Sequence, residues 1–163
     1  MKFDDGTTRE NATYDGVMIK QADVNLLAYP LGFYQDKEQV RKDLDYYAPR
    51  MSPEGPAMGV AILSILYNQL GETDKAAEIF EASYKPNEVP PFGVLAETAG
   101  GTNPYFATGA GGMLQAVLAG FGGLRITENG IEQIETSVPA SWGKLIITGA
   151  GKNDATFETT GGN

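Results

Sequence analysis

The hydrophobic and polar positions in the first two thirds of the chain follow the spacing of helices. From Val17 to Tyr29 the apolar residues are too dense for a surface stripe, which predicts a mostly buried helix that ends before a proline. Further on, Val40, Leu44 and Tyr47 recur at helical spacing, and Asp36 precedes them as an N-cap residue. The pattern therefore predicts a buried helix followed by an amphipathic one.

The same alternation repeats in the middle of the chain. The segment AMGVAILSILYNQL follows Pro56 and carries almost no charge until Gly71, so it predicts a second core helix. An amphipathic helix opens at Thr73 or Asp74, and a glycine-dense helix is predicted from about residue 104 to Gly120. Alternating buried and amphipathic helices are what a layered helical toroid or solenoid requires.

After Gly122 the pattern changes to short runs of β-prone residues. These runs lie at 124–127, 131–134, 144–148 and, more weakly, 155–158, with turn residues between them. They predict the start of a small antiparallel β module. Three or four short strands seldom form a sheet with its own core, so the module either leans on the helices or is incomplete.

Composition narrows the function. The 163 residues are 42% hydrophobic, which suits one domain with a core. The 12 basic and 21 acidic residues give a net charge of −9, which argues against nucleic acid or an anionic membrane surface as a partner. The chain has no histidine and no cysteine, which excludes Ser-His-Asp triads, cysteine nucleophiles and zinc sites with these ligands. Carboxylates, lysine, tyrosine and amides remain, and no cofactor or metal is expected.

One carboxylate stands out by its position. Glu97 lies in a loop framed by proline and glycine, just before the glycine-dense helix. Loops held between rigid elements carry binding and catalytic groups disproportionately often. Charged residues are mostly exposed, however, so an ordinary solvated glutamate is the alternative interpretation.

Two polar residues interrupt the first predicted helix. Lys20 and Gln21 place an ammonium and an amide among apolar neighbours. Such groups need polar partners, and sugar hydroxyls would serve. Alternatively, Lys20 extends its ammonium to solvent and Gln21 caps a neighbouring loop.

Four groups of residues occur in a fixed order along the chain. They are KQADV at 20–24, LDYYAPR at 44–50 with SPEGPAM at 52–58, PFGVLAE at 91–97, and TGAGGMLQAVL at 108–118 followed by GLRI at 123–126. Together they resemble the C-terminal part of a glycoside hydrolase family 65 protein, over about residues 14–127. This family includes acid trehalases, kojibiose hydrolases, glucosylgalactosylhydroxylysine glucosidases and inverting disaccharide phosphorylases.

The resemblance implies a mainly α fold. Residues 1–122 would form the C-terminal part of a catalytic (α/α)6 barrel, and residues 123–163 the first strands of a C-terminal β domain. The family's N-terminal β-sandwich, first barrel helices and general-acid glutamate would lie upstream of this chain. We therefore expect a fragment or one piece of a split enzyme, whose partner carries the missing barrel half. Exposed apolar faces would also favour a homo-oligomer.

The resemblance also implies roles for the three candidate residues. Inverting hydrolysis uses one carboxylic acid to protonate the leaving oxygen and one carboxylate to activate water on the opposite face of the sugar. Glu97 takes the position of this general base. Lys20 and Gln21 take the positions of a pair that holds the glucosyl hydroxyls. The implied substrate is an α-glucoside such as trehalose or kojibiose.

Two alternatives stay open. Disaccharide phosphorylases of the family use phosphate as the attacking group, and their loop at this position resembles a cradle of serine or threonine with histidine. The carboxylate of Glu97 and the lack of histidine favour hydrolysis. The second alternative is a non-catalytic helical module for carbohydrate binding or scaffolding, because the general acid is absent.

Overall fold

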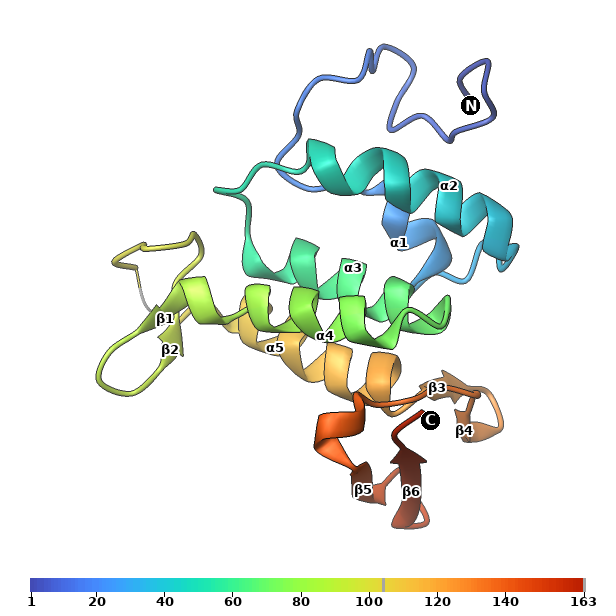
Figure 1. Ribbon diagram of the computed structural model, residues 1–163, viewed down its shortest axis with the longest axis vertical. Coiled ribbons are helices and arrows are strands. Elements are labelled where there is room, and N and C mark those ends of the chain that lie inside the picture. Colours follow the sequence, from blue (N-terminus) through green and yellow to red (C-terminus); the bar gives the residue numbers. More distant parts are fainter. Residues whose placement is uncertain (104, 163) are drawn as a thin grey trace.

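The computed structural model describes residues 1–103 and 105–162, and it shows helices and small antiparallel hairpins (Figure 1). The helices are α1 (Val24–Ala28), α2 (Lys37–Tyr47), α3 (Ala57–Gln69), α4 (Thr73–Ala82) and α5 (Ala107–Gln115). The strands are β1 (Glu88–Val89), β2 (Val94–Leu95), β3 (Leu124–Thr127), β4 (Gly130–Gln133), β5 (Lys144–Ala150) and β6 (Ala155–Thr160). The chain is therefore a mixed structure in which one hairpin lies between α4 and α5 and the other two follow the helices.

Helix α3 is the centre of the core. It packs against α4 on one side and α5 on another, and Figure 1 shows these three helices running alongside one another. Its side chains Ile65 and Leu66 are fully buried, as expected for a helix without charges. A buried side chain of this kind contributes about 2–5 kcal/mol relative to alanine. The prediction of a core helix at this position is confirmed.

Local signals fix the ends of the middle helices. The Asp36 carboxylate accepts the backbone N–H of Glu38 and caps α2, as the sequence predicted. Gly71 follows α3 with φ of +85°, a left-handed conformation that suits glycine and ends the helix. Helix α4 begins at Thr73 and buries Ala76 and Phe80, which confirms the amphipathic prediction.

The prediction of the first helix, from Val17 to Tyr29, is wrong over most of its length. Only Val24–Ala28 is helical, and residues 17–23 are irregular. The N–H of Ile19 donates to the carbonyl of Arg50 at 2.9 Å, and the carbonyl of Ile19 accepts the N–H of Ser52 at 2.7 Å. These bonds form a short parallel bridge with the segment after α2 and replace helical hydrogen bonds.

The start of α1 is set by a distant carboxylate. Glu10 accepts the backbone N–H groups of Asp23 and Val24 at 2.8 and 3.1 Å. A negative group at the N-terminus of a helix accepts hydrogen bonds from the free N–H groups and interacts favourably with the positive end of the helix dipole. Lys20 and Gln21 therefore lie on an exposed connection and not on a buried helix.

The glycine-dense helix differs from its prediction at both ends. Residue 104, its predicted start, lies outside the described residues, and α5 begins at Ala107. The helix continues as π-helical turns from Ala116 to Phe121. A Cβ on Gly112 would lie 3.0 Å from the Cα of Met58, so glycine permits close packing of α5 on α3.

Within residues 1–103 and 105–162 the strands form three separate two-stranded hairpins and no continuous sheet. β3 coincides with the predicted run, and it pairs with β4 around the predicted Asn129-Gly130 turn. Asn68 of α3 joins the helices to the connection between β4 and β5. Its amide donates to Thr136 Oγ1 at 2.7 Å and to the carbonyls of Gly120 and Ser137 at 3.0 and 3.1 Å.

The described helices are all too short or too polar to cross a membrane.

Tyrosine hydroxyls tie the N-terminal segment to the second helix. Tyr47 donates to the carbonyl of Thr8 at 2.7 Å. Tyr34 donates to the carboxylate of Asp43, which also accepts the N–H of Thr8 at 2.7 Å. Burial raises the pKa of both tyrosines, and for Tyr34 the hydrogen bond to Asp43 raises it further. The folded chain therefore holds these protons more tightly than the unfolded chain does.

We expect the free energy of unfolding to fall as the pH rises above about 10. Below the ordinary tyrosine pKa of about 10 both states are protonated, and the stabilisation is complete. Above it the unfolded state loses protons first, so stability falls by up to about 1.4 kcal/mol per pH unit for each tyrosine. Urea denaturation followed by circular dichroism from about pH 8 to 12 measures this slope.

A phenylalanine substitution isolates the contribution of one hydroxyl. Tyr47→Phe should lower stability at neutral pH but make the alkaline decline shallower, because one linked proton is removed. Tyr105→Phe, at an exposed side chain, should behave as the unchanged protein. An equally steep alkaline decline in Tyr47→Phe would contradict the linkage.

Candidate functional site

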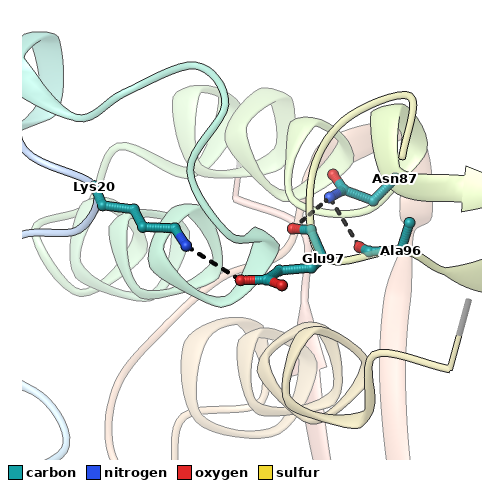
Figure 2. A network of polar contacts seen from close by, with 4 residues as sticks. All are labelled: Lys20, Asn87, Ala96 and Glu97. Carbon is teal, nitrogen blue, oxygen red and sulfur yellow. Dashed lines mark hydrogen bonds and ion pairs between the residues drawn. The ribbon is translucent and has the colours of Figure 1, made fainter. Parts of the chain in front are cut away.

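Two candidate residues that are 77 positions apart in the sequence meet in the structure. The ammonium of Lys20 lies 3.2 Å from Oε1 of Glu97, and Figure 2 shows the two side chains pointing toward each other. Lys20 comes from the connection before α1, and Glu97 from the loop after β2. Their side chains are 63% and 38% exposed, so water reaches both. An ion pair this exposed contributes only about 0.2–1 kcal/mol, and a ligand that bonds to Lys20 can displace it.

The backbone at Glu97 is held by a residue that the sequence analysis missed. The side-chain amide of Asn87 donates to the carbonyls of Ala96 and Glu97, each at 3.1 Å (Figure 2). The N–H of Ala96 in turn donates to the backbone carbonyl of Asn87 at 2.8 Å. Asn87 is 5% exposed and Ala96 is fully buried. An asparagine beside a proline normally indicates a turn, so the sequence carried no sign that this one is buried.

Two backbone hydrogen bonds hold the loop between β2 and α5, which carries Glu97 and is called the Glu97 loop. The carbonyl of Leu95 accepts the N–H of Phe106 at 2.8 Å, and the carbonyl of Pro86 accepts the N–H of Gly100 at 2.9 Å. The first bond brings the residues that precede α5 back to the end of β2. Glu97 is therefore carried by a short loop that is anchored on both sides.

The backbone at Lys20 packs closely against Gly55. A Cβ on Gly55 would lie 2.5 Å from the carbonyl oxygen of Lys20 and 2.8 Å from that of Ser52, distances that no side chain accommodates. Gly55 belongs to the SPEGP part of the 52–58 motif. That motif was visible in the sequence, but its contact with Lys20 was not.

Gln21 lies apart from the Lys20–Glu97 pair. Its amide donates to Oδ1 of Asp23 at 3.3 Å. Both residues line an open groove of about 620 Å³ formed mainly by α1, α3 and α5. Most of the lining is apolar, and Thr108 and Gln115 add polar groups from α5. Such a volume and lining suit a small ligand or a packed helix. The structure thus brings Lys20 and Glu97 together and places the third predicted site residue, Gln21, on a groove whose lining does not include the other two.

Within the described part of the chain, acidic side chains do not gather in groups of three or more that could hold a metal ion. The polar groups described at this site are the carboxylate of Glu97, the ammonium of Lys20 and the amide of Asn87.

Comparison with known proteins identifies relatives. Residues 6–87 match the family described as "Glycosyl hydrolase family 65 central catalytic domain". A kojibiose hydrolase of Mucilaginibacter mallensis is 56% identical over 158 residues, which are 96% of this chain and 23% of that protein. A kojibiose hydrolase of Flavobacterium johnsoniae is 51% identical over 161 residues, which are 98% of this chain and 24% of that protein.

A solved structure shows a similar fold. It is described as "Putative kojibiose phosphorylase from human microbiome", and it superimposes with a TM-score of 0.66 at 19% sequence identity. The match covers 88% of this chain and 20% of that one. The chain thus spans less than a quarter of the length of the proteins that it resembles.

Proposed function

This chain belongs to glycoside hydrolase family 65, and we propose that it forms part of an inverting enzyme that hydrolyses an α-glucosidic bond. Kojibiose is the first substrate to test, because both of the bacterial relatives above are named kojibiose hydrolases. Trehalose and related α-glucosides are the other candidates. The observation that carries the proposal is the contact of 3.2 Å between Lys20 and Glu97.

Glu97 is the proposed general base. In an inverting reaction the base removes a proton from water while that water attacks the anomeric carbon, and the acid protonates the leaving oxygen. The two carboxyl groups stand roughly 6.5–9.5 Å apart to leave room for the water. Two features support this role for Glu97. Its backbone carbonyl is hydrogen-bonded to Asn87, and its carboxylate is accessible to water. The acid would come from the larger part of the catalytic domain that this chain does not span.

Lys20 and Gln21 are the proposed glucosyl-binding residues. The three N–H donors of an ammonium suit the oxygen atoms of sugar hydroxyls, and an amide both donates and accepts. When a glucosyl unit takes up the hydrogen bonds of Lys20, the ammonium leaves Glu97. The carboxylate is then free to accept a proton from water. Gln21 would have to turn from Asp23 toward the same sugar.

Hydrolysis is preferred to phosphorolysis on chemical grounds. Phosphate attacks directly and needs no base, whereas a carboxylate near its path would repel it. Glu97 would therefore hinder the phosphorylase reaction and assist the hydrolase reaction. The solved structure described as a putative kojibiose phosphorylase is similar to this chain in fold alone, at 19% identity.

The proposed setting of the site is an (α/α)6 barrel. Residues 1–122 would supply its C-terminal part, and residues 123–163 the first strands of the β domain. The support is an exposed apolar surface on the groove formed by α1, α3 and α5, which includes Leu31, Leu114 and Leu118. A surface of this kind is normally covered by another element. In the complete domain the remaining barrel helices would cover it.

Without these helices we expect the chain to associate with itself through the groove. Light scattering after size-exclusion chromatography should give a mass above the 17.4 kDa of one chain. The double substitution Leu114→Glu and Leu118→Glu should restore the monomer, because charge in the groove opposes burial. Phe92→Glu, at an exposed position on the β1–β2 hairpin, is the matched control and should leave the mass unchanged. A monomeric parent chain would contradict the expectation.

A chimaera tests the proposed activity. In it this chain replaces the aligned segment of the Mucilaginibacter mallensis kojibiose hydrolase, which is 56% identical. We expect the chimaera to release glucose from kojibiose at the same rate with and without phosphate. Formation of glucose 1-phosphate in phosphate buffer would identify a phosphorylase instead. If the parent enzyme is active but the folded chimaera shows neither activity, both the hydrolase and the phosphorylase proposals are contradicted.

A further inference from the structure

We infer that Asn87 is a positioning residue for Glu97, because its buried side chain bonds to the backbone of the residue that carries the carboxylate and of the residue before it. The inference rests on the proposed function, in which Glu97 is the general base. It adds a residue that touches neither sugar nor water. Asn87 would act through the direction in which the Glu97 side chain leaves the loop.

Three hydrogen bonds join position 87 to the Glu97 loop. The amide nitrogen of Asn87 donates to two consecutive carbonyls, those of Ala96 and Glu97, at 3.1 Å each. The backbone carbonyl of Asn87 accepts the N–H of Ala96 at 2.8 Å. Both carbonyls turn toward one nitrogen, which fixes the peptide planes on both sides of the Glu97 Cα. Figure 2 shows the amide lying against this stretch of backbone.

The chemistry at this position suits asparagine. Asparagine offers two N–H donors on one nitrogen, one for each carbonyl. Aspartate has the same size but would set a carboxylate against two carbonyl oxygens in a buried place. Alanine would leave both carbonyls without this donor. Asn87→Asp and Asn87→Ala therefore remove the same two bonds, one with the volume kept and one without.

Glu97 needs such support because its own side chain is weakly held. Its partner Lys20 is 63% exposed, and the ion pair is of the kind that contributes little. During the proposed reaction that pair also opens, since Lys20 turns to the sugar. The backbone is then what keeps the carboxylate in line with the attacking water. A displacement of about 1 Å at a catalytic group can cost about 100-fold in rate.

A merely structural role is the competing explanation, and a second buried asparagine provides the control for it. Asn68 is 2% exposed, and its amide donates to the carbonyls of Gly120 and Ser137 and to Thr136 Oγ1. It joins α3 to the hairpin region and makes no contact with the Glu97 loop among these bonds. Asn68→Ala should therefore lower stability as much as Asn87→Ala does, with kcat unchanged below the unfolding transition.

The test is a double-substitution cycle in the chimaera. Asn87→Asp and Asn87→Ala should each lower kcat for kojibiose by about 10–100-fold with KM nearly unchanged. When Glu97→Gln is already present, adding Asn87→Ala should lower kcat no further, because the two residues act through the same carboxylate. Hydrogen exchange of residues 94–99 should become faster in Asn87→Ala and stay unchanged in Asn68→Ala.

The outcomes separate this inference from the proposed function. An unchanged kcat in Asn87→Ala, or an additive loss in the double variant, would overturn the positioning role. Unchanged exchange of residues 94–99 would overturn it as well, whatever the activity. If Glu97→Gln alone leaves kcat unchanged while exchange in Asn87→Ala rises, Asn87 does hold the loop, and the proposed general base is what fails.

Discussion

Glu97→Gln should lower kcat of the chimaera for kojibiose by about 1,000-fold and leave KM almost unchanged. Removal of a general base typically costs about 100- to 10,000-fold, because the proton is transferred only in the transition state. Glutamine keeps the size of glutamate and one acceptor oxygen, but its amide cannot take up the proton. Initial rates of glucose release over a range of kojibiose concentrations separate kcat from KM.

A neighbouring glutamate provides the control for Glu97. Glu88 opens the β1–β2 hairpin that precedes Glu97 and is exposed, so Glu88→Gln makes the same chemical change outside the proposed site. We expect kcat of Glu88→Gln to equal that of the unchanged chimaera. A loss of less than tenfold in Glu97→Gln would exclude Glu97 as the base.

Lys20→Ala should have the second-largest effect, with kcat/KM lowered by about 10–100-fold. A hydrogen bond to a charged group is worth about 1.5–3 kcal/mol, which converts to a factor in this range. Unlike Glu97→Gln, this substitution should raise KM and lower kcat together. Lys20 would bond to the glucosyl unit in the ground state and still hold it in the transition state.

The control for Lys20 is a lysine with a similar exposed ion pair. The ammonium of Lys85 lies 2.7 Å from Oε2 of Glu81, and the Lys85 side chain is 53% exposed. Lys85→Ala removes an ammonium and an ion pair of the same kind but no proposed sugar contact. If Lys20→Ala changed the kinetics as little as Lys85→Ala, Lys20 would be a surface residue.

The fold was predictable where the signals are local. Helices α2, α3 and α4 carry their apolar spacing and their end signals within a few residues, such as Asp36 before α2 and Gly71 after α3. The prediction of helix α1 failed because its boundaries depend on contacts with residues far away in the sequence. Glu10 caps it from 13 positions away, and Arg50 and Ser52 take the hydrogen bonds of Ile19. Spacing rules do not see such partners.

The candidate site was predictable only in part. Residue motifs pointed to Lys20, Gln21 and Glu97, but nothing local showed that two of them meet across 77 positions. Asn87 was missed because its burial depends on how the β1–β2 hairpin folds back, which a single sequence does not reveal. The catalytic and binding roles of all four residues stay predictions.

The groove and the ion pair together suggest how the site is divided. Gln21 and Asp23 line the groove, whereas Lys20 and Glu97 are not among its lining residues. In the proposed function the glucosyl unit lies at Lys20 and Glu97, and Gln21 turns toward it from the groove.

The most direct measurement is a crystal structure of the chimaera carrying Glu97→Gln with intact kojibiose bound. We expect the ammonium of Lys20 to bond to hydroxyls of the glucosyl unit, and one water to lie between residue 97 and the anomeric carbon, on the face opposite the leaving oxygen. A glucosyl unit bound out of reach of residue 97, with no place for such a water, would contradict the general-base role of Glu97.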